Sequence, residues 1–288
     1  MRYCLVSTNH LADALWFKDT DDYRVGMNLV AVVSCALGIP VLAFILMSNH
    51  VHFVLLCDRA KAELFITAFK KQYGRYYRLK YGTKELLRRN KVDIQELDPS
   101  DDSVEWAIAY TVMNSVAANL CISPGAYAWG TGNSYFQCPP AKGKRLDSLS
   151  GRARKRLLHS KADLPGGFLV SDNGYILPES YVRVRLVESR FRTPKRMIFY
   201  LSNSSKARQR LQTADEMIPA FSDQSIASVL PDLCRSLFGA GKASALSEPQ
   251  LSELFRQVRF RFSANIGQIA RTTGFPPETV TRLLDTYK

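Results

Sequence analysis

The first part of the chain alternates short apolar runs with longer amphipathic stretches. Apolar runs at 3–8, 40–47 and 51–57 predict buried strands, since short continuous runs bounded by polar residues are typical of strands. Helical spacing of apolar residues over 21–37 and 61–80 predicts two helices. The order strand, helix, strand, strand, helix favours an α+β domain in which helices cover an antiparallel sheet.

A further helix is predicted over residues 103–119. Ser103 follows an acidic segment and is a suitable N-cap residue. One apolar stripe at helical spacing is expected from Trp106, Ala109, Met113, Val116 and Ala117. Tyr110 and Asn114 are four residues apart, so their side chains are expected to be neighbours on the helix surface.

The composition changes after this first domain, which we place at 1–137. Residues 138–165 are rich in Pro, Gly, Ser, Lys and Arg and are predicted to form a basic linker or mobile loop. A mostly helical C-terminal domain is expected over 166–288, beginning with a short hairpin at 168–178. Its helices are predicted near 194–203, 206–213, 224–238 and 248–259.

The end of the chain, at about 264–286, has the pattern of a helix-turn-helix. Ala270 permits a close approach of two helices and Gly274 suits the tight turn, after which the second helix begins near Pro277. The shared core is expected from Ile266, Ile269, Val280, Leu283 and Leu284. The second helix is expected to present Glu278, Thr279, Thr281 and Arg282 to a DNA major groove, and the nearby Arg271 is a further candidate DNA-binding residue. Short helical hairpins also occur as mere packing units, so the pattern leaves both uses open.

The net charge of +13 and a pI near 9.5 favour a polyanionic partner. The predicted helix 61–80 interleaves cations with aromatic rings, a combination that can hold phosphates and stack bases. Its candidate DNA-binding residues are Lys70, Lys71, Tyr73, Arg75, Tyr77 and Arg78. The alternative is that the aromatic rings face the core and the cations are solvated. Basic runs at 142–145 and 152–156 either contact a DNA hairpin or keep a linker soluble.

The six cysteines contain no Cys-x2-Cys pair, so a zinc ribbon is not indicated. The sequence has no signal-peptide pattern and no apolar run long enough to span a membrane. We therefore expect no membrane partner, and a reducing cytoplasmic location is the simplest interpretation.

Two histidines provide the most informative local pattern. His50 and His52 lie between apolar runs, after a turn predicted at Ser48 and Asn49. Residues i and i+2 of a strand point to the same face, so both imidazoles can bind one metal ion. The plainer alternative is a pair of hydrogen-bonded structural histidines.

These features together resemble a known family, the single-tyrosine HUH transposases, in particular the REP-associated tyrosine transposases. Residues 47–53 (Met-Ser-Asn-His-Val-His-Phe) resemble its Met-Pro-Asn-His-Val-His signature. Residues 109–118 are similar to its second signature, a tyrosine four residues before Asn-Pro-Val, and 124–135 to its Tyr-x-Trp-Ser-Ser segment. Residues 3–8 look like its first strand, so the resemblance covers roughly 1–137, just under half of the chain.

The chain departs from the family pattern at three places. Ser48 and Ser115 replace prolines that supply no chemistry, and residues 80–102 lack the usual Trp-x-x-Arg-Phe stretch, which affects local DNA contacts.

The resemblance implies a ferredoxin-like palm and an activity that nicks and rejoins single-stranded or hairpin DNA. Tyr110 is then the nucleophile that forms a covalent 5′-phosphotyrosine, while His50, His52 and Asn114 hold a divalent metal. Nitrogen and oxygen ligands without a thiolate suit Mg²⁺ or Mn²⁺ more than Zn²⁺. The helix-turn-helix is expected to hold duplex DNA, and the protein to be a monomer or a homodimer.

Two other functions remain open. One is a non-catalytic DNA-binding regulator that retains the HUH fold and binds through the helix-turn-helix. The other is an RNA-binding or RNA-processing protein with the same palm. The intact set of His50, His52, Tyr110 and Asn114 favours the enzyme over the regulator. Binding that fails to distinguish DNA from RNA would support the RNA-binding protein.

Overall fold

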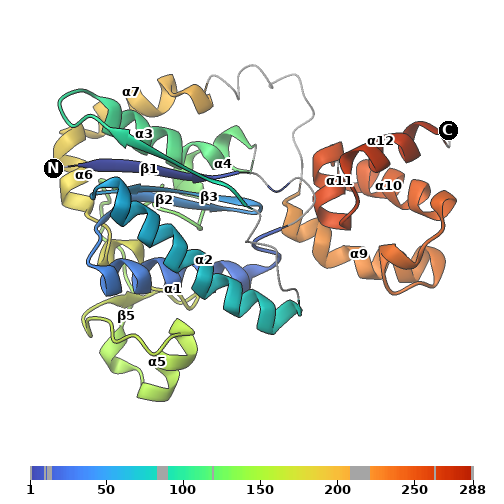
Figure 1. The fold of residues 1–288 in the computed structure, drawn as a ribbon, viewed down its shortest axis with the longest axis horizontal. Coiled ribbons are helices and arrows are strands. Elements are labelled where there is room, and N and C mark those ends of the chain that lie inside the picture. The colour runs from blue at the N-terminus through green and yellow to red at the C-terminus, as the bar shows by residue number, and fades with distance from the viewer. Residues whose placement is uncertain are drawn as a thin grey trace.

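The fold is α+β, as the pattern predicts, and is built on a four-stranded antiparallel sheet (Figure 1). The strand order is β2-β3-β1-β4, so β3 and β1 are central. The strands are β1 Tyr3–Thr8, β2 Val41–Met47, β3 His50–Leu55 and β4 Val92–Leu97. This computed structural model describes residues 2–9, 11, 15–82, 90–118, 120–207, 221–262 and 264–286.

Helices cover both faces of the sheet (Figure 1). α1 (Thr20–Leu37) and α2 (Arg59–Tyr81) lie on one face, and α3 (Ser103–Val112) and α4 (Asn114–Ala117) lie on the other. Strands β1, β2 and β3, the first two helices and the Tyr110 helix were predicted from the sequence, whereas β4 was not.

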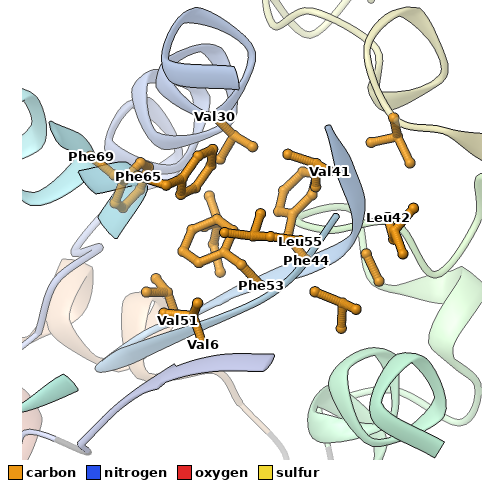
Figure 2. Close-up of a cluster of buried hydrophobic side chains, with 14 of the residues drawn as sticks. Val6, Val30, Val41, Leu42, Phe44, Val51, Phe53, Leu55, Phe65 and Phe69 are labelled. Atoms are coloured by element: carbon orange, nitrogen blue, oxygen red, sulfur yellow. The ribbon is translucent and has the colours of Figure 1, made fainter. Parts of the chain in front are cut away.

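The main core lies between the sheet and the α1–α2 layer (Figure 2). The Phe53 ring of β3 meets Phe65 and Phe69 of α2, at centroid distances of 5.2 and 5.3 Å. Val6 is the cross-strand partner of Phe53 and is also fully buried. Because side chains alternate along a strand, His52 points to the opposite face, toward α3.

The outer edge of β2 is covered by another part of the chain. The backbone N–H of Thr131 donates to the Phe44 carbonyl at 3.0 Å, and the N–H of Leu46 donates to the Trp129 carbonyl at 2.9 Å. A Cβ on Gly130 would lie 2.7 Å from the Phe44 carbonyl oxygen, so only glycine permits this close approach.

The predicted basic linker at 138–165 is wrong as a description of this segment. It contains a two-residue strand and a helix that packs on α1, and its Leu146, Leu158 and Leu164 are buried in the main core. These leucines are spaced among many cations, which hid their common burial from a composition-based prediction. The core therefore continues past residue 137, as far as Tyr200.

The elements of this middle part are short. Its two-stranded sheet and helices are β5 Lys144–Arg145, α5 Gly151–Leu158, β6 Leu169–Val170, α6 Val184–Phe191 and α7 Pro194–Asn203. The 3-10 helices of the described residues are η1 Pro124–Ala126, η2 Leu146–Ser148, η3 Pro178–Ser180 and η4 Ala243–Ala245. The expected hairpin at 168–178 is present as a bridge between Val170 and Ile176, while β6 itself pairs with β5.

The C-terminal region is helical and has a core of its own, which we call the helical module, residues 221–286. Its helices are α9 Asp223–Phe238, α10 Glu248–Phe262, α11 Ile266–Thr273 and α12 Pro277–Thr286. The turn between α11 and α12 contains Gly274 at φ +80°, a left-handed conformation that favours glycine and agrees with the tight turn predicted there. Ile269, Val280 and Leu283 are buried as expected, whereas Ile266 is 37% exposed, which corrects its assignment to this core.

The predicted helix 103–119 differs from the structure in three respects. It is interrupted at Met113, and Asn119 lies outside the described residues. The N-cap residue is Asp102 rather than Ser103, which is the first helical residue. Trp106 is 36% exposed, so it does not belong to the buried stripe.

Most of the helix predicted at 206–213 also lies outside the described residues. Among the helices that the structure describes, none combines the length and apolar character needed to cross a membrane.

Candidate active site

The two histidines of β3 lie together on the α3 face of the sheet. Their ring centroids are 4.9 Å apart and the rings are perpendicular, with His50 and His52 only 3% and 2% exposed. β3 is paired on both sides, because His52 lies opposite Ile45 of β2 and Ser7 of β1. The sheet therefore fixes the backbone beneath both imidazoles.

Asn49 orients the His50 ring. Its amide nitrogen donates to the Leu11 carbonyl at 2.8 Å, which leaves its oxygen, Oδ1, 2.9 Å from Nδ1 of His50. An amide oxygen only accepts, so the His50 Nδ1 carries the proton and Nε2 carries the lone pair. A buried imidazole held in this way through one nitrogen is typical of metal-binding histidines.

Tyr110 of α3 completes the cluster from above the sheet. Its ring meets that of His52 edge-on, with 5.4 Å between the centroids. Burial raises the pKa of the Tyr110 phenol above its usual value, because the phenolate is poorly solvated there. The side chain is therefore a neutral phenol in the protein alone, and ionisation needs positive charge brought to its oxygen.

Lys206 is a site residue that the sequence did not suggest. Its Nζ atom lies 5.0 Å from the centroid of the Tyr110 ring, and burial lowers the pKa of this amine. No sequence pattern links Lys206 to Tyr110, since 96 positions separate them along the chain. The contact nevertheless places a cationic group beside the phenol.

Asn114 lies one turn after Tyr110, at the start of α4. Its amide nitrogen donates to the carbonyls of Tyr110 and Thr111, at 2.9 and 3.2 Å, so the side chain bonds back onto its own helix. The amide oxygen is then the atom that can serve as a ligand. Asn114 is 3% exposed, and α4 packs against β2.

Among the residues that the structure describes, no carboxylate or thiolate joins the two histidines in a metal-binding group. Within the described ranges, nowhere do three or more His, Cys, Asp or Glu side chains gather as a metal cluster. Two imidazoles with an amide oxygen suit a metal that keeps water or phosphate oxygens as its remaining ligands.

The α2 candidates divide into two groups. Tyr73 and Tyr77 are buried, and their hydroxyls donate to the carbonyls of Trp16 and Leu15 at 2.5 and 3.1 Å, so the prediction that they stack on bases is wrong. Lys70 donates to the Asn90 carbonyl at 2.7 Å. The exposed cations of this set are Lys71, Arg75 and Arg78. They belong to the helix layer on the face of the sheet opposite Tyr110.

The helix-turn-helix candidates are also divided. Thr281 and Arg282 are exposed and Thr279 is half-buried on α12, although Arg282 pairs with Glu248 at 2.7 Å. The Arg271 guanidinium pairs with the buried Asp223 at 2.8 Å, so it is engaged inside the protein rather than presented to DNA.

Asp223 joins the helical module to the turn that precedes His50. Its carboxylate accepts from Ser48 Oγ at 2.9 Å and from Gln268 Nε2 at 3.0 Å, in addition to the Arg271 guanidinium. Gln224 adds a bond to the Phe17 carbonyl at 2.8 Å. Ser48 stands where the resembled family has proline, and a proline has no hydroxyl to make this bond.

Comparison with protein-family models, with curated proteins and with solved structures gives no match. The resemblance to the HUH transposases therefore depends on the motif residues and on the geometry around them.

Proposed function

We propose that this protein is a metal-dependent endonuclease and strand transferase for single-stranded DNA, acting through Tyr110. The observation that carries the proposal is that strand β3 and helix α3 bring their candidate catalytic side chains together. The paired histidines of β3 and the tyrosine of α3 lie on the same face of the sheet, with Tyr110 against His52.

The topology supports the palm that the resemblance implies. The order β1-α1-β2-β3-α2-β4, with the strands arranged β2-β3-β1-β4, matches the ferredoxin-like split βαβ arrangement. In that arrangement β3 is central, so His50 and His52 have rigid support.

The proposed reaction is a transfer of a phosphodiester to the phenol. The Tyr110 oxygen attacks phosphorus as the phenolic proton leaves, and a bond forms between phosphorus and this oxygen. The bond between phosphorus and the 3′ oxygen of the departing strand breaks, and that oxygen takes up a proton to become a 3′ hydroxyl. The 5′-phosphotyrosine keeps the bond energy, so attack by another 3′ hydroxyl rejoins DNA without ATP.

The chain's own residues prepare this step. His50 through Nε2, His52, and Asn114 through its amide oxygen are the proposed ligands of Mg²⁺ or Mn²⁺, which when bound neutralises charge on the phosphate oxygens. Lys206 adds positive charge beside the Tyr110 ring. Asn49 holds the His50 ring in the tautomer that presents Nε2.

A non-catalytic DNA-binding regulator is the second candidate. The observation that favours it is the α11–α12 pair, whose turn at Gly274 and exposed Thr281 fit a helix-turn-helix. Binding of duplex DNA by α11 and α12 is equally consistent with the proposed nuclease.

The deciding experiment is covalent capture of labelled single-stranded and hairpin oligonucleotides with Mg²⁺ or Mn²⁺. The enzyme predicts a protein–DNA adduct that survives denaturing electrophoresis and disappears in Tyr110→Phe, in His50→Ala and on metal chelation. Tyr76→Phe is the matched control, because Tyr76 lies on α2, away from the site. Tight salt-sensitive binding without any adduct supports the regulator, and equal binding of matched RNA and DNA strands supports the RNA-binding function.

A further inference from the structure

A groove with a volume of about 560 Å³ opens beside Tyr110. This size falls within the roughly 300–1,000 Å³ that is typical of small-molecule sites. Its floor is formed by β1 and β4, and one wall is formed by α3 through Trp106 and Tyr110. Ser204 and Ser205, which follow α7, also line the groove.

The strand register connects the groove floor to the histidine pair. His52 of β3 lies opposite Ser7 of β1, and Ser7 lies opposite Asp93 of β4. Paired residues of neighbouring strands point to the same face, so these three side chains form one row across the sheet. α3 covers the His52 end of this row, while Ser7 and Asp93 line the groove.

Trp106 is the feature of the groove that points to a ligand. It precedes Tyr110 by four residues, so the two rings are neighbours on α3. Tyr200 packs edge-on against the Trp106 ring with 4.7 Å between the centroids, and Tyr200 is itself held by Asp102 and Arg196. The indole is thus supported on one side and 36% exposed where it lines the groove.

The charges of the site favour different positions for the phosphate and for the base of a nucleotide. The Lys206 ammonium lies over the Tyr110 ring, which favours phosphate there, whereas the exposed Asp93 carboxylate on the groove floor repels phosphate. A carboxylate accepts hydrogen bonds from base amino groups, as Asp and Glu do from cytosine N4. Thymine offers no amino group.

We propose that this groove binds the unpaired base next to the phosphate that Tyr110 attacks, stacked on Trp106 and with its amino group bonded to Asp93. The inference rests on the proposed function, which supplies the phosphate at Tyr110. It identifies the substrate as an extended single strand and predicts that the nucleotide whose base enters the groove is cytosine rather than thymine.

Binding without chemistry tests the groove. Labelled oligo(dC) and oligo(dT) are titrated with the full chain in the presence of a chelator, and affinities are read by fluorescence anisotropy. We expect Trp106→Ala to weaken binding of both strands about tenfold or more, since base–aromatic stacking is worth roughly 1–3 kcal/mol per base. Trp106→Phe should restore much of this loss, because it returns an aromatic face.

Phe199→Ala is the matched control, because Phe199 is an exposed aromatic residue of α7 that does not line the groove. Equal affinities for Trp106→Ala and Phe199→Ala, with both variants melting as the parent does, overturn the stacking role. In Asp93→Ala the ratio of oligo(dC) to oligo(dT) affinity should fall toward one. An unchanged ratio overturns the proposed base preference.

The covalent assay separates this inference from the nuclease. If groove binding depends on Trp106 but no adduct ever forms, the nuclease fails and the base site remains. If the parent forms the adduct and Trp106→Ala binds and reacts as the parent does, the base site fails and the nuclease remains.

Discussion

Replacing Asp223 by alanine tests how the helical module is attached to the rest of the protein. Asp223 is 4% exposed and accepts hydrogen bonds from Ser48, Gln268 and Arg271. The substitution leaves the Arg271 guanidinium without its carboxylate, and this side chain keeps only 21% exposure to water.

The expected loss of unfolding free energy follows from those contacts. Breaking a fully buried ion pair costs about 3–5 kcal/mol, and the partial exposure of Arg271 moves the expectation to the lower end, about 3 kcal/mol. Ser48→Ala removes one hydrogen bond to the charged carboxylate, for which we expect about 1.5–3 kcal/mol.

Urea denaturation followed by far-UV circular dichroism measures these losses. Asp223→Ala, Arg271→Ala and the double variant form a cycle, in which the double variant should lose at least about 1 kcal/mol less than the sum of the singles. Asp232→Ala is the control on the same helix, since its pair with Arg235 is 64–71% exposed and should contribute nothing measurable. Strict additivity of the cycle, or a loss in Asp223→Ala no larger than in Asp232→Ala, refutes the reasoning.

Three further outcomes are expected. Phe53→Ala should lower the free energy of unfolding by about 3–5 kcal/mol in the same denaturation assay, because it leaves a cavity against α2. Leu79 is 78% exposed, so Leu79→Ala should have little effect, and equal losses in the two variants would contradict the placing of Phe53 in the core. Burial lowers the pKa of His159, so its contribution to the free energy of unfolding should be fully present above the unfolded-state pKa near 6.5 and should be lost as pH falls below that value. His159→Gln should flatten this decline, and a variant whose stability changes with pH as the parent's does would contradict the prediction. Asn49→Ala should weaken Mn²⁺ binding about 10–100-fold in calorimetry, because it removes the acceptor that orients the His50 ring. Parental Mn²⁺ affinity in Asn49→Ala would refute this orienting role.

Local patterns predicted most of the first domain. The three strands follow from short continuous apolar runs, because β2 and β3 are buried at every position, and the helices near 21–37 and 61–80 follow from their helical spacing of apolar residues. The strand Val92–Leu97 was missed, since its exposed Asp93 and Gln95 alternate with few apolar residues and make an edge strand look like a loop.

The candidate site was predictable only in part. The pair His50 and His52 shares a strand, and Tyr110 precedes Asn114 by one helical turn, so sequence spacing alone suggests each pair. Contacts between distant segments leave no such pattern. Lys206 reaches Tyr110 only through the fold.

Misassigned residues have the same cause. Tyr73 and Tyr77 lie among cations in the sequence, yet the helix turns their rings inward, where each hydroxyl finds a backbone carbonyl. Arg271 looked like a DNA contact because its buried carboxylate partner lies 48 residues earlier in the chain. Composition reports which residues are present in a segment but not which face they occupy.

The covered edge of β2 limits how copies of this protein can join. Residues 129–131 occupy the hydrogen-bonding positions along that edge, and Gly130 lets their backbone approach where a side chain would collide. A second molecule therefore cannot lengthen the sheet by adding a strand beside β2. The other end of the sheet is β4, where the exposed Asp93 and Glu96 place negative charge along the edge strand, which opposes pairing with another strand. Self-association by sheet extension is therefore disfavoured at both ends of this sheet.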